Sequence, residues 1–174
     1  CRSYAIKNAR ENNQNNDGIY LEFGVYKGLS ANFFSKYVNK LYVFDSFEGL
    51  KEDWEGTSAP KGSLNLDKKL PNLNSNIVPI VGWIEDTLDE FLKKHNPKTS
   101  FVHIDVDTYK TTKYILERIK PHLKSGSIII FDELYNYVGW EHGEYKALVE
   151  VFREDEFSFK AFAIHSCRAV IQIN

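Results

Sequence analysis

The chain has 174 residues, of which 43% are hydrophobic and 26% are charged, as in one soluble globular domain. Its 22 Lys and Arg residues nearly balance its 24 Asp and Glu residues, so no nucleic-acid partner is expected. Two cysteines are too few for a disulfide framework or a zinc cluster, which favours a reducing, cytoplasmic location. No apolar stretch approaches the ~20 residues of a membrane span, so no membrane partner is expected.

The N-terminal residues are expected to be the remnant of a longer N-terminal region. The chain contains no methionine, even at position 1, so we expect it to be a fragment, with residues 1–18 as that remnant. Residues 1–10 are predicted to end a helix, and the polar run NNQNNDG at 12–18 predicts a loop.

The stretch IYLEFGVYKG at residues 19–28 organises the rest of the prediction. An apolar run at 19–23 predicts the first strand, and two glycines four residues apart predict a tight turn after it. Residues 29–39 carry aromatic pairs at i,i+4 spacing and predict a helix, with Ser30 as its N-cap. A second apolar run at 41–44 predicts the next strand, which ends in Asp45.

Strands and helices then alternate to the end of the chain, which predicts an α/β fold with a mostly parallel sheet. Residues 49–76 have no strand period and contain Trp54, which favours a lid loop. The remaining predicted strands are 77–81, 101–104 and 126–131 with a closing antiparallel pair at 157–164 and 169–173, and the predicted helices are 86–94, 111–120 and 141–153.

Acidic residues follow several of these strands, at the edge where ligands bind in open α/β sheets. Asp45, about 20 residues beyond the glycine turn, has the position of a ribose-binding acid. The turn lacks both the GxGxxG spacing of dinucleotide enzymes and the P-loop pattern, and one glycine with a nearby acid suits an S-adenosylmethionine site. The alternative is a turn that needs glycine for steric reasons alone.

A second acidic group follows the two central strands and predicts a metal site. Asp105, Asp107, Asp132 and Glu133 are hard oxygen ligands suited to Mg²⁺ or another divalent hard cation. Such an ion would lower the pKa of a substrate hydroxyl and position it. The alternative is that one acid caps the helix that begins near Thr108 while the others are solvated.

Two histidines lie in segments that suggest a role for them. His103 lies in a predicted buried strand, which favours a hydrogen-bonded core histidine. A competing interpretation uses His103 and Asp105 in the facial triad of a non-haem iron oxygenase, which the helical segments oppose. His142, near Tyr137 and Trp140, is a candidate catalytic base or part of an acceptor pocket, the alternative being an aromatic surface loop.

Five segments together resemble the macrocin O-methyltransferase (TylF-type) family of class I S-adenosylmethionine-dependent methyltransferases. The resemblance runs from about Tyr20 to the C-terminus and rests on YLEFGVYKGLSANFF, VFDSFEGL, GWIEDTL, FVHIDVDTY and GSIIIFDELYNYVGWEHGEYKAL. It implies a Rossmann-like α/β fold: a seven-stranded, mostly parallel sheet of order 3-2-1-4-5-7-6 with helices on both faces. It also implies Mg²⁺-dependent methylation of a hydroxyl on a sugar or glycosylated small molecule.

The resemblance further implies roles for individual residues. The methionine end of the cofactor, its ribose and its adenine would be bound by Glu22, Phe23, Gly24, Val25, Tyr26, Ser30, Asp45, Ser46, Gly82, Trp83, Glu85, Asp86 and Asp105. Asp105 or Asp107 would bind the metal with Asp132 and Glu133, and the same Asp-x-Asp pair would supply the general base.

The chain also departs from the family pattern. The family pair after the fifth strand is often Asp-Asp, whereas this chain has Asp132-Glu133. Family members carry an N-terminal region that helps to cover the acceptor and to form a homo-oligomer, and almost none of it is present. A non-catalytic cofactor-binding or interaction module cut from a longer polypeptide is therefore the alternative function.

Overall fold

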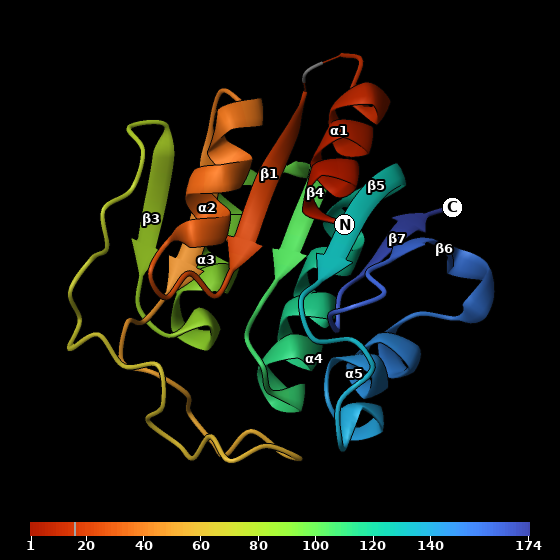
Figure 1. Cartoon of the computed structure of the whole chain (residues 1–174). Helices are drawn as coiled ribbons and strands as arrows, with labels where there is room; N and C mark the ends of the chain where they lie inside the picture. Colours follow the sequence, from red (N-terminus) through yellow and green to blue (C-terminus); the bar gives the residue numbers. More distant parts are fainter. Residues whose placement is uncertain (16) are drawn as a thin grey trace.

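The computed structural model describes residues 1–15 and 17–174, and its centre is a single seven-stranded sheet (Figure 1). The strand order is β3-β2-β1-β4-β5-β7-β6, with β7 antiparallel to both β5 and β6, which confirms the predicted Rossmann-like arrangement. The strands are β1 (Gly18–Phe23), β2 (Leu41–Asp45), β3 (Ile77–Val81), β4 (Lys98–Ile104), β5 (Leu123–Phe131), β6 (Phe157–Phe162) and β7 (Ala169–Ile173).

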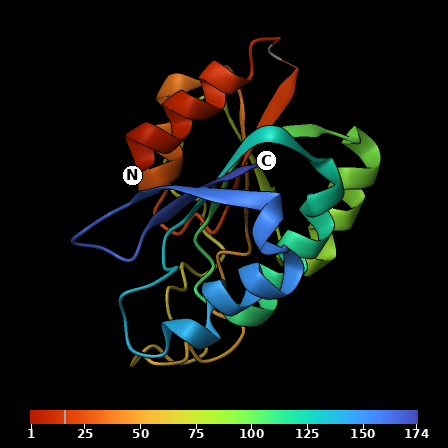
Figure 2. The same ribbon diagram turned by 90° about the vertical axis from the view of Figure 1, so that its right-hand side faces the viewer.

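Helices cover both faces of this sheet, with α1 and α2 on one side and α3, α4 and α5 on the other (Figure 2). None of the helices in the described part of the chain is long and apolar enough to cross a membrane. The α-helices are α1 (Arg2–Asn12), α2 (Leu29–Phe34), α3 (Ile84–His95), α4 (Tyr109–Ile119) and α5 (Glu144–Val151), and the 3-10 turns are η1 (Ser35–Tyr37), η2 (Lys120–His122), η3 (Trp140–His142) and η4 (Glu154–Glu156).

The two faces of the sheet bury separate hydrophobic clusters because side chains alternate along each strand. In β5, Ile129 and Phe131 pack into the cluster of α3, α4 and α5, whereas Ile128 and Ile130 pack into the cluster of α1 and α2. The same alternation determines whether a polar residue just beyond a strand faces α1 and α2 or faces α3, α4 and α5.

Helix α1 is an integral part of the second cluster. Ala5, Ile6 and Ala9 are fully buried in it, and the helix contacts β4 and β5. These small and branched side chains on one face let α1 lie close to the sheet, so that its first turn reaches the carboxyl end of β5.

Three local predictions are wrong. The helix expected at 29–39 is α-helical only to Phe34 and then tightens into η1. Its N-cap is Gly28, at a φ of 75° that favours glycine, and Ser30 is buried inside the helix. The last helix begins at Glu144, because residues 140–142 form the separate turn η3.

The loop at 49–76 runs below the carboxyl ends of the strands in Figure 1. All of its residues are described, and none of them forms a helix or strand. It is held by its own turns and by a contact with the loop after β5, where the rings of Trp54 and Tyr137 meet edge to face at 6.1 Å. Gly56 crosses this second loop so closely that a Cβ would lie 1.7 Å from the carbonyl oxygen of Val138.

Candidate active site

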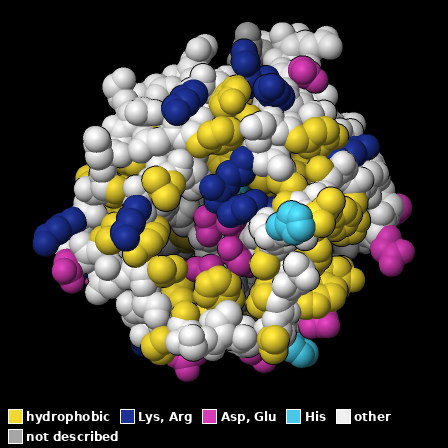
Figure 3. Space-filling view, viewed as in Figure 1, with side chains coloured by type: hydrophobic (Ala, Val, Ile, Leu, Met, Phe, Trp, Pro, Cys, Tyr) yellow, Lys and Arg dark blue, Asp and Glu magenta, His cyan; other side chains and the backbone are white. Residues whose placement is uncertain are grey.

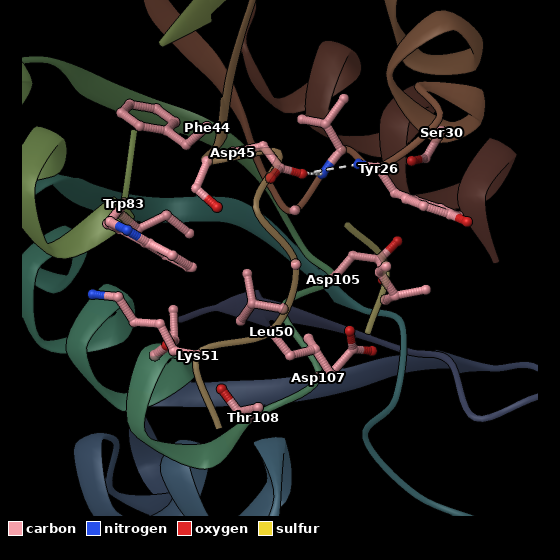
Figure 4. Close-up of a pocket in the computed structure, with 18 of the residues that line it drawn as sticks. Tyr26, Ser30, Phe44, Asp45, Leu50, Lys51, Trp83, Asp105, Asp107 and Thr108 are labelled. Carbon is pink, nitrogen blue, oxygen red and sulfur yellow. Dashed lines mark hydrogen bonds between the residues drawn. The ribbon is translucent and has the colours of Figure 1, made fainter. Parts of the chain in front are cut away.

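A cavity of about 500 Å³ opens at the carboxyl ends of β1, β2 and β4, within the size range of small-molecule sites (Figure 4). Its walls come from segments far apart in the chain, including the glycine turn, the end of β2 and the start of α3. The predicted site residues that line it are Gly24, Val25, Tyr26, Ser30, Asp45, Ser46, Trp83, Glu85, Asp105 and Asp107.

The glycine turn is held against the neighbouring strand by backbone contacts. Gly24 has a φ of 85°, and a Cβ there would lie 1.7 Å from the carbonyl oxygen of Asp105. The backbone N–H of Asp105 donates to the carbonyl of Phe23 at 2.9 Å, which sets this close approach. The requirement for glycine at 24 is thus accounted for by packing within the protein, as in the steric alternative.

Asp45 connects the end of β2 to the glycine turn. Its Oδ2 accepts hydrogen bonds from the backbone N–H groups of Val25 at 2.7 Å and Tyr26 at 2.9 Å, and Oδ1 accepts from Phe47 at 2.7 Å. A carboxylate offers about four acceptor positions, so Asp45 retains roughly one for a ligand. The first two bonds are drawn in Figure 4.

Trp83 and Lys51 form the opposite wall of the cavity in Figure 4. The ammonium nitrogen of Lys51 lies 4.8 Å from the centre of the Trp83 ring and 2.7 Å from the carboxylate of Glu85. Burial raises the pKa of Glu85, but its hydrogen bonds and the charge of Lys51 together outweigh burial and leave that pKa lowered. Thr111 also donates to this carboxylate at 3.1 Å, so Glu85 is fixed at the cavity wall.

An acidic cluster forms at the ends of β4 and β5. Asp105, Asp107 and Glu133 can each offer one oxygen, and the three oxygens lie within 4.8 Å of one another. Burial, reinforced by neighbouring carboxylates, raises the pKa of Asp105 to about 6, of Asp107 to about 7 and of Glu133 to about 12. Arg2 lies 4.0 Å from Asp105, but Asp107 and Glu133 have no ion pair with a cationic residue among those described.

This donor set fits a hard divalent cation. It consists only of carboxylate oxygens, the ligands that Mg²⁺ prefers, and Oε2 of Glu133 is buried without a partner among the described residues. Asp107 also holds a left-handed φ of 63°, which turns its side chain into the cavity wall. A bound cation would supply the positive charge that these acids lack.

Asp132, also a predicted metal ligand, has an oxygen close to His103 and Asp105 in a second possible metal group, and cationic side chains surround it. Its carboxylate accepts two hydrogen bonds from Arg168, at 2.6 and 2.8 Å, and one from Arg2 at 2.9 Å. The Nε2 atom of His103 lies 3.2 Å away. Burial raises the pKa of Asp132, but His103 and Arg168 outweigh it and hold that pKa well below its usual range.

His103 continues this polar chain into the sheet. Its other nitrogen, Nδ1, lies 2.9 Å from Glu22, and both side chains are fully buried. Burial alone would lower the pKa of His103, but hydrogen bonds with Asp132 and Glu22 outweigh it and raise the pKa to about 10. A protonated histidine has no free nitrogen for a metal, which together with the α/β fold argues against the iron-oxygenase interpretation.

The remaining predicted residues lie outside the cavity. Glu22 is buried against His103, and His142 is exposed on η3. The residues that do not line the cavity are Glu22, Phe23, Gly82, Asp86, Asp132, Glu133 and His142.

Several charged residues of the site were missed by the sequence analysis. Arg2 and Arg168 line the cavity, and Glu144 is buried beside Glu133. In Figure 3, Lys and Arg side chains lie directly above Asp and Glu side chains at the hollow in this face. Arg168 lies beside Asp132 because Phe131 pairs with Ala169 in antiparallel strands, and no short sequence pattern indicates this register.

Comparison with solved structures supports the fold. The calicheamicin methyltransferase CalS11 aligns with a TM-score of 0.79 and 22% identity, over 97% of this chain and 77% of that one. The O-methyltransferase NovP aligns with a TM-score of 0.69 and 18% identity, over 99% of this chain and 78% of that one. An O-methyltransferase from Bacillus cereus was solved in complex with S-adenosylhomocysteine. It aligns with a TM-score of 0.63 and 14% identity, over 99% of this chain and 81% of that one.

Comparison by sequence identifies the family. A search of curated proteins finds no match. The family model described as a methyltransferase domain matches residues 21–134, which span β1 to the end of β5 and include the glycine turn, Asp45, Trp83 and the acidic cluster. This chain therefore belongs to the methyltransferase domain family.

Proposed function

We propose that the chain is an S-adenosylmethionine-dependent O-methyltransferase that acts, with a divalent cation, on a hydroxyl of a sugar or glycosylated small molecule. One observation carries this proposal. A single cavity reaches from Asp45 and Trp83 at one end to Asp105 and Asp107 at the other. It thus joins groups suited to a nucleoside with carboxylates suited to a cation and a proton.

The cofactor would occupy the part of the cavity between the glycine turn and Trp83. Asp45 has about one acceptor position left for a ribose hydroxyl, and the ring of Trp83 offers a face for adenine. The turn at 24–26 and Ser30 would lie along the methionine part. The S-adenosylhomocysteine complex of the similar Bacillus cereus enzyme supports this choice of cofactor.

The acidic cluster would hold the cation and accept the proton. When bound, S-adenosylmethionine supplies an electrophilic methyl group and the cation lowers the pKa of a coordinated hydroxyl. Asp107 would take the proton that the hydroxyl loses, because its carboxylate lines the cavity beside the proposed cation. Asp105 and Glu133 would complete the ligand set.

The acceptor class rests on similarity. One structure of CalS11 describes it as a TDP-rhamnose 3′-O-methyltransferase, and the five sequence segments resemble the macrocin O-methyltransferase family, so a sugar hydroxyl is the proposed acceptor. The loop at 49–76 would act as the lid, since Leu50 and Lys51 already line the cavity and Trp54 contacts the loop after β5.

Calorimetry and a transfer assay test this function together. We expect S-adenosylhomocysteine to bind with micromolar affinity, and a panel of glycosides to include one that gains a methyl group in the presence of Mg²⁺ but not of a chelator. Absence of cofactor binding would contradict the proposal. Binding without transfer to any hydroxyl would favour the non-catalytic module instead.

A further inference from the structure

Glu144 is a buried acid that no role in the proposed reaction uses. It is the first residue of α5, and its exposed fraction is 0%. Gly143 before it is tightly enclosed, since a Cβ there would lie 2.4 Å from the hydroxyl oxygen of Tyr137. The start of α5 is therefore fixed beneath the loop that follows β5, with the Glu144 side chain turned inward.

The two oxygens of Glu144 have different surroundings. Oε2 accepts a hydrogen bond from the backbone N–H of Glu133 at 3.1 Å, which places the carboxylate directly against a residue of the acidic cluster. Oε1 is buried and has no hydrogen-bond partner among the described residues, and neither has Oε2 of Glu133. Buried carboxylate oxygens are normally paired, so these two atoms indicate a missing partner.

Glu133 and Glu144 lie apart from the ion pairs of the site. Among the ion pairs of the described residues, none involves Glu133 or Glu144, whereas Asp132 alone contacts two arginines and a histidine. Glu133 and Glu144 thus lie against each other, and neither forms an ion pair with a cationic side chain among the described residues.

We propose that Glu144 is the outer acid of the cation site, where one oxygen fixes Glu133 and the other accepts a hydrogen bond from a water on the cation. The inner ligands are Asp105, Asp107 and Glu133, whose oxygens lie within 4.8 Å of one another, a set that does not include Glu144. Mg²⁺ and similar ions keep several waters when bound by a few carboxylates, so an outer acceptor has a defined function. This inference rests on the proposed cation site.

Titration with Mn²⁺, followed by electron paramagnetic resonance, tests this role without any assay of activity. Glu144→Gln keeps the size of the side chain and an oxygen that can accept from Glu133, but it removes the charge. We expect it to weaken Mn²⁺ binding by about 10- to 100-fold, as do changes next to metal ligands. Glu141→Gln is the matched control, because Glu141 is exposed three residues earlier, and it should bind Mn²⁺ like the wild type.

The outcomes separate this inference from the proposed function. If the wild type binds Mn²⁺ and Glu144→Gln binds it equally well, the outer role is overturned while the cation site stands. If the wild type binds no Mn²⁺, the cation site itself fails, and this inference fails with it. Should Glu144→Gln not fold, Glu144→Asp gives the same test, because the shorter side chain withdraws both oxygens and unchanged affinity would overturn the proposal.

Discussion

Asp132 and Glu133 are neighbours in the chain but lie in opposite electrostatic environments. Asp132 contacts Arg2, Arg168 and His103, which hold its pKa well below the usual range. Glu133 has no cationic partner among the described residues, and burial with nearby acids raises its pKa to about 12. The protein supplies cationic partners to Asp132, whereas Glu133 has none among the described residues.

The alternation of the β-strand explains this difference. Glu22, His103 and Ile130 are neighbours across the strands, and Ile130 packs on the face of α1. Asp132 lies two residues beyond Ile130 and therefore meets the same face, where α1 supplies Arg2. Glu133 turns toward α5 and meets Glu144. We infer that the Asp132 network on the α1 face stabilises the sheet edge, whereas Glu133 on the α5 face serves the reaction together with Asp105 and Asp107.

The largest expected effect is on turnover, from Asp107→Asn. This change removes the proposed proton acceptor and one cation ligand, so we expect transfer to slow by about 100- to 10,000-fold. Affinity for S-adenosylhomocysteine should change by less than about 3-fold, because the cofactor end of the cavity is untouched. Steady-state kinetics and calorimetry on the same preparation measure both. Wild-type turnover in the variant would remove Asp107 from the mechanism.

Asp132→Ala should instead affect stability. It leaves two arginines and a histidine around a buried site without their shared carboxylate, which costs about 3–5 kcal/mol of unfolding free energy. Glu133→Gln is the comparison, and we expect it to change stability by less than about 1 kcal/mol. Urea unfolding of both variants checks this. Equal losses would contradict the division between the two faces.

The α1-face network also predicts a pH dependence. The pKa of His103 is raised to about 10 in the folded protein, above its ordinary value of 6.5. Its contribution to stability is therefore complete below pH 6.5 and lost as the pH rises through 10, with a slope of at most about 1.4 kcal/mol per pH unit. His103→Asn should abolish the slope and His122→Gln should retain it. A flat profile in the wild type would show that His103 is neutral.

The smallest effect is expected for Arg2→Ala. The guanidinium of Arg2 is 29% exposed and donates to Asp132 at 2.9 Å, so its loss should cost about 1–2 kcal/mol of unfolding free energy. Arg118→Ala is the matched control, since Arg118 pairs with Asp89 on the exposed surface, and we expect no measurable change. If both variants had the same free energy of unfolding, the contact of Arg2 with Asp132 would not contribute to stability, and α1 would contribute only through its apolar face.

The sequence was informative about the fold because strands and helices have local signals. The apolar run at 77–81 predicted β3 at its observed bounds, and the closing pair of strands was correctly expected to be antiparallel. Acids at the strand ends, including Asp45 and Asp105, predicted the edge of the sheet at which the cavity lies. Such features depend on a few consecutive residues and on the known geometry of parallel sheets.

Pairing between distant side chains was not predictable in the same way. His103 was correctly expected to be a hydrogen-bonded core residue, but the sequence did not indicate that Glu22 and Asp132 are its partners. The strand register determines these contacts, and no short pattern encodes it. Nothing in the sequence around Arg2 indicated that it contacts Asp132, because this contact depends on how α1 packs across the sheet.

The most direct test of this account is the position of a bound cation in crystals soaked with Mn²⁺, located by anomalous diffraction. We predict one site between Asp105, Asp107 and Glu133, with Asp132 still held by Arg2 and Arg168. A cation bound to Asp132, with the arginines displaced, would contradict the division of the sheet edge into a stabilising face and a reactive one.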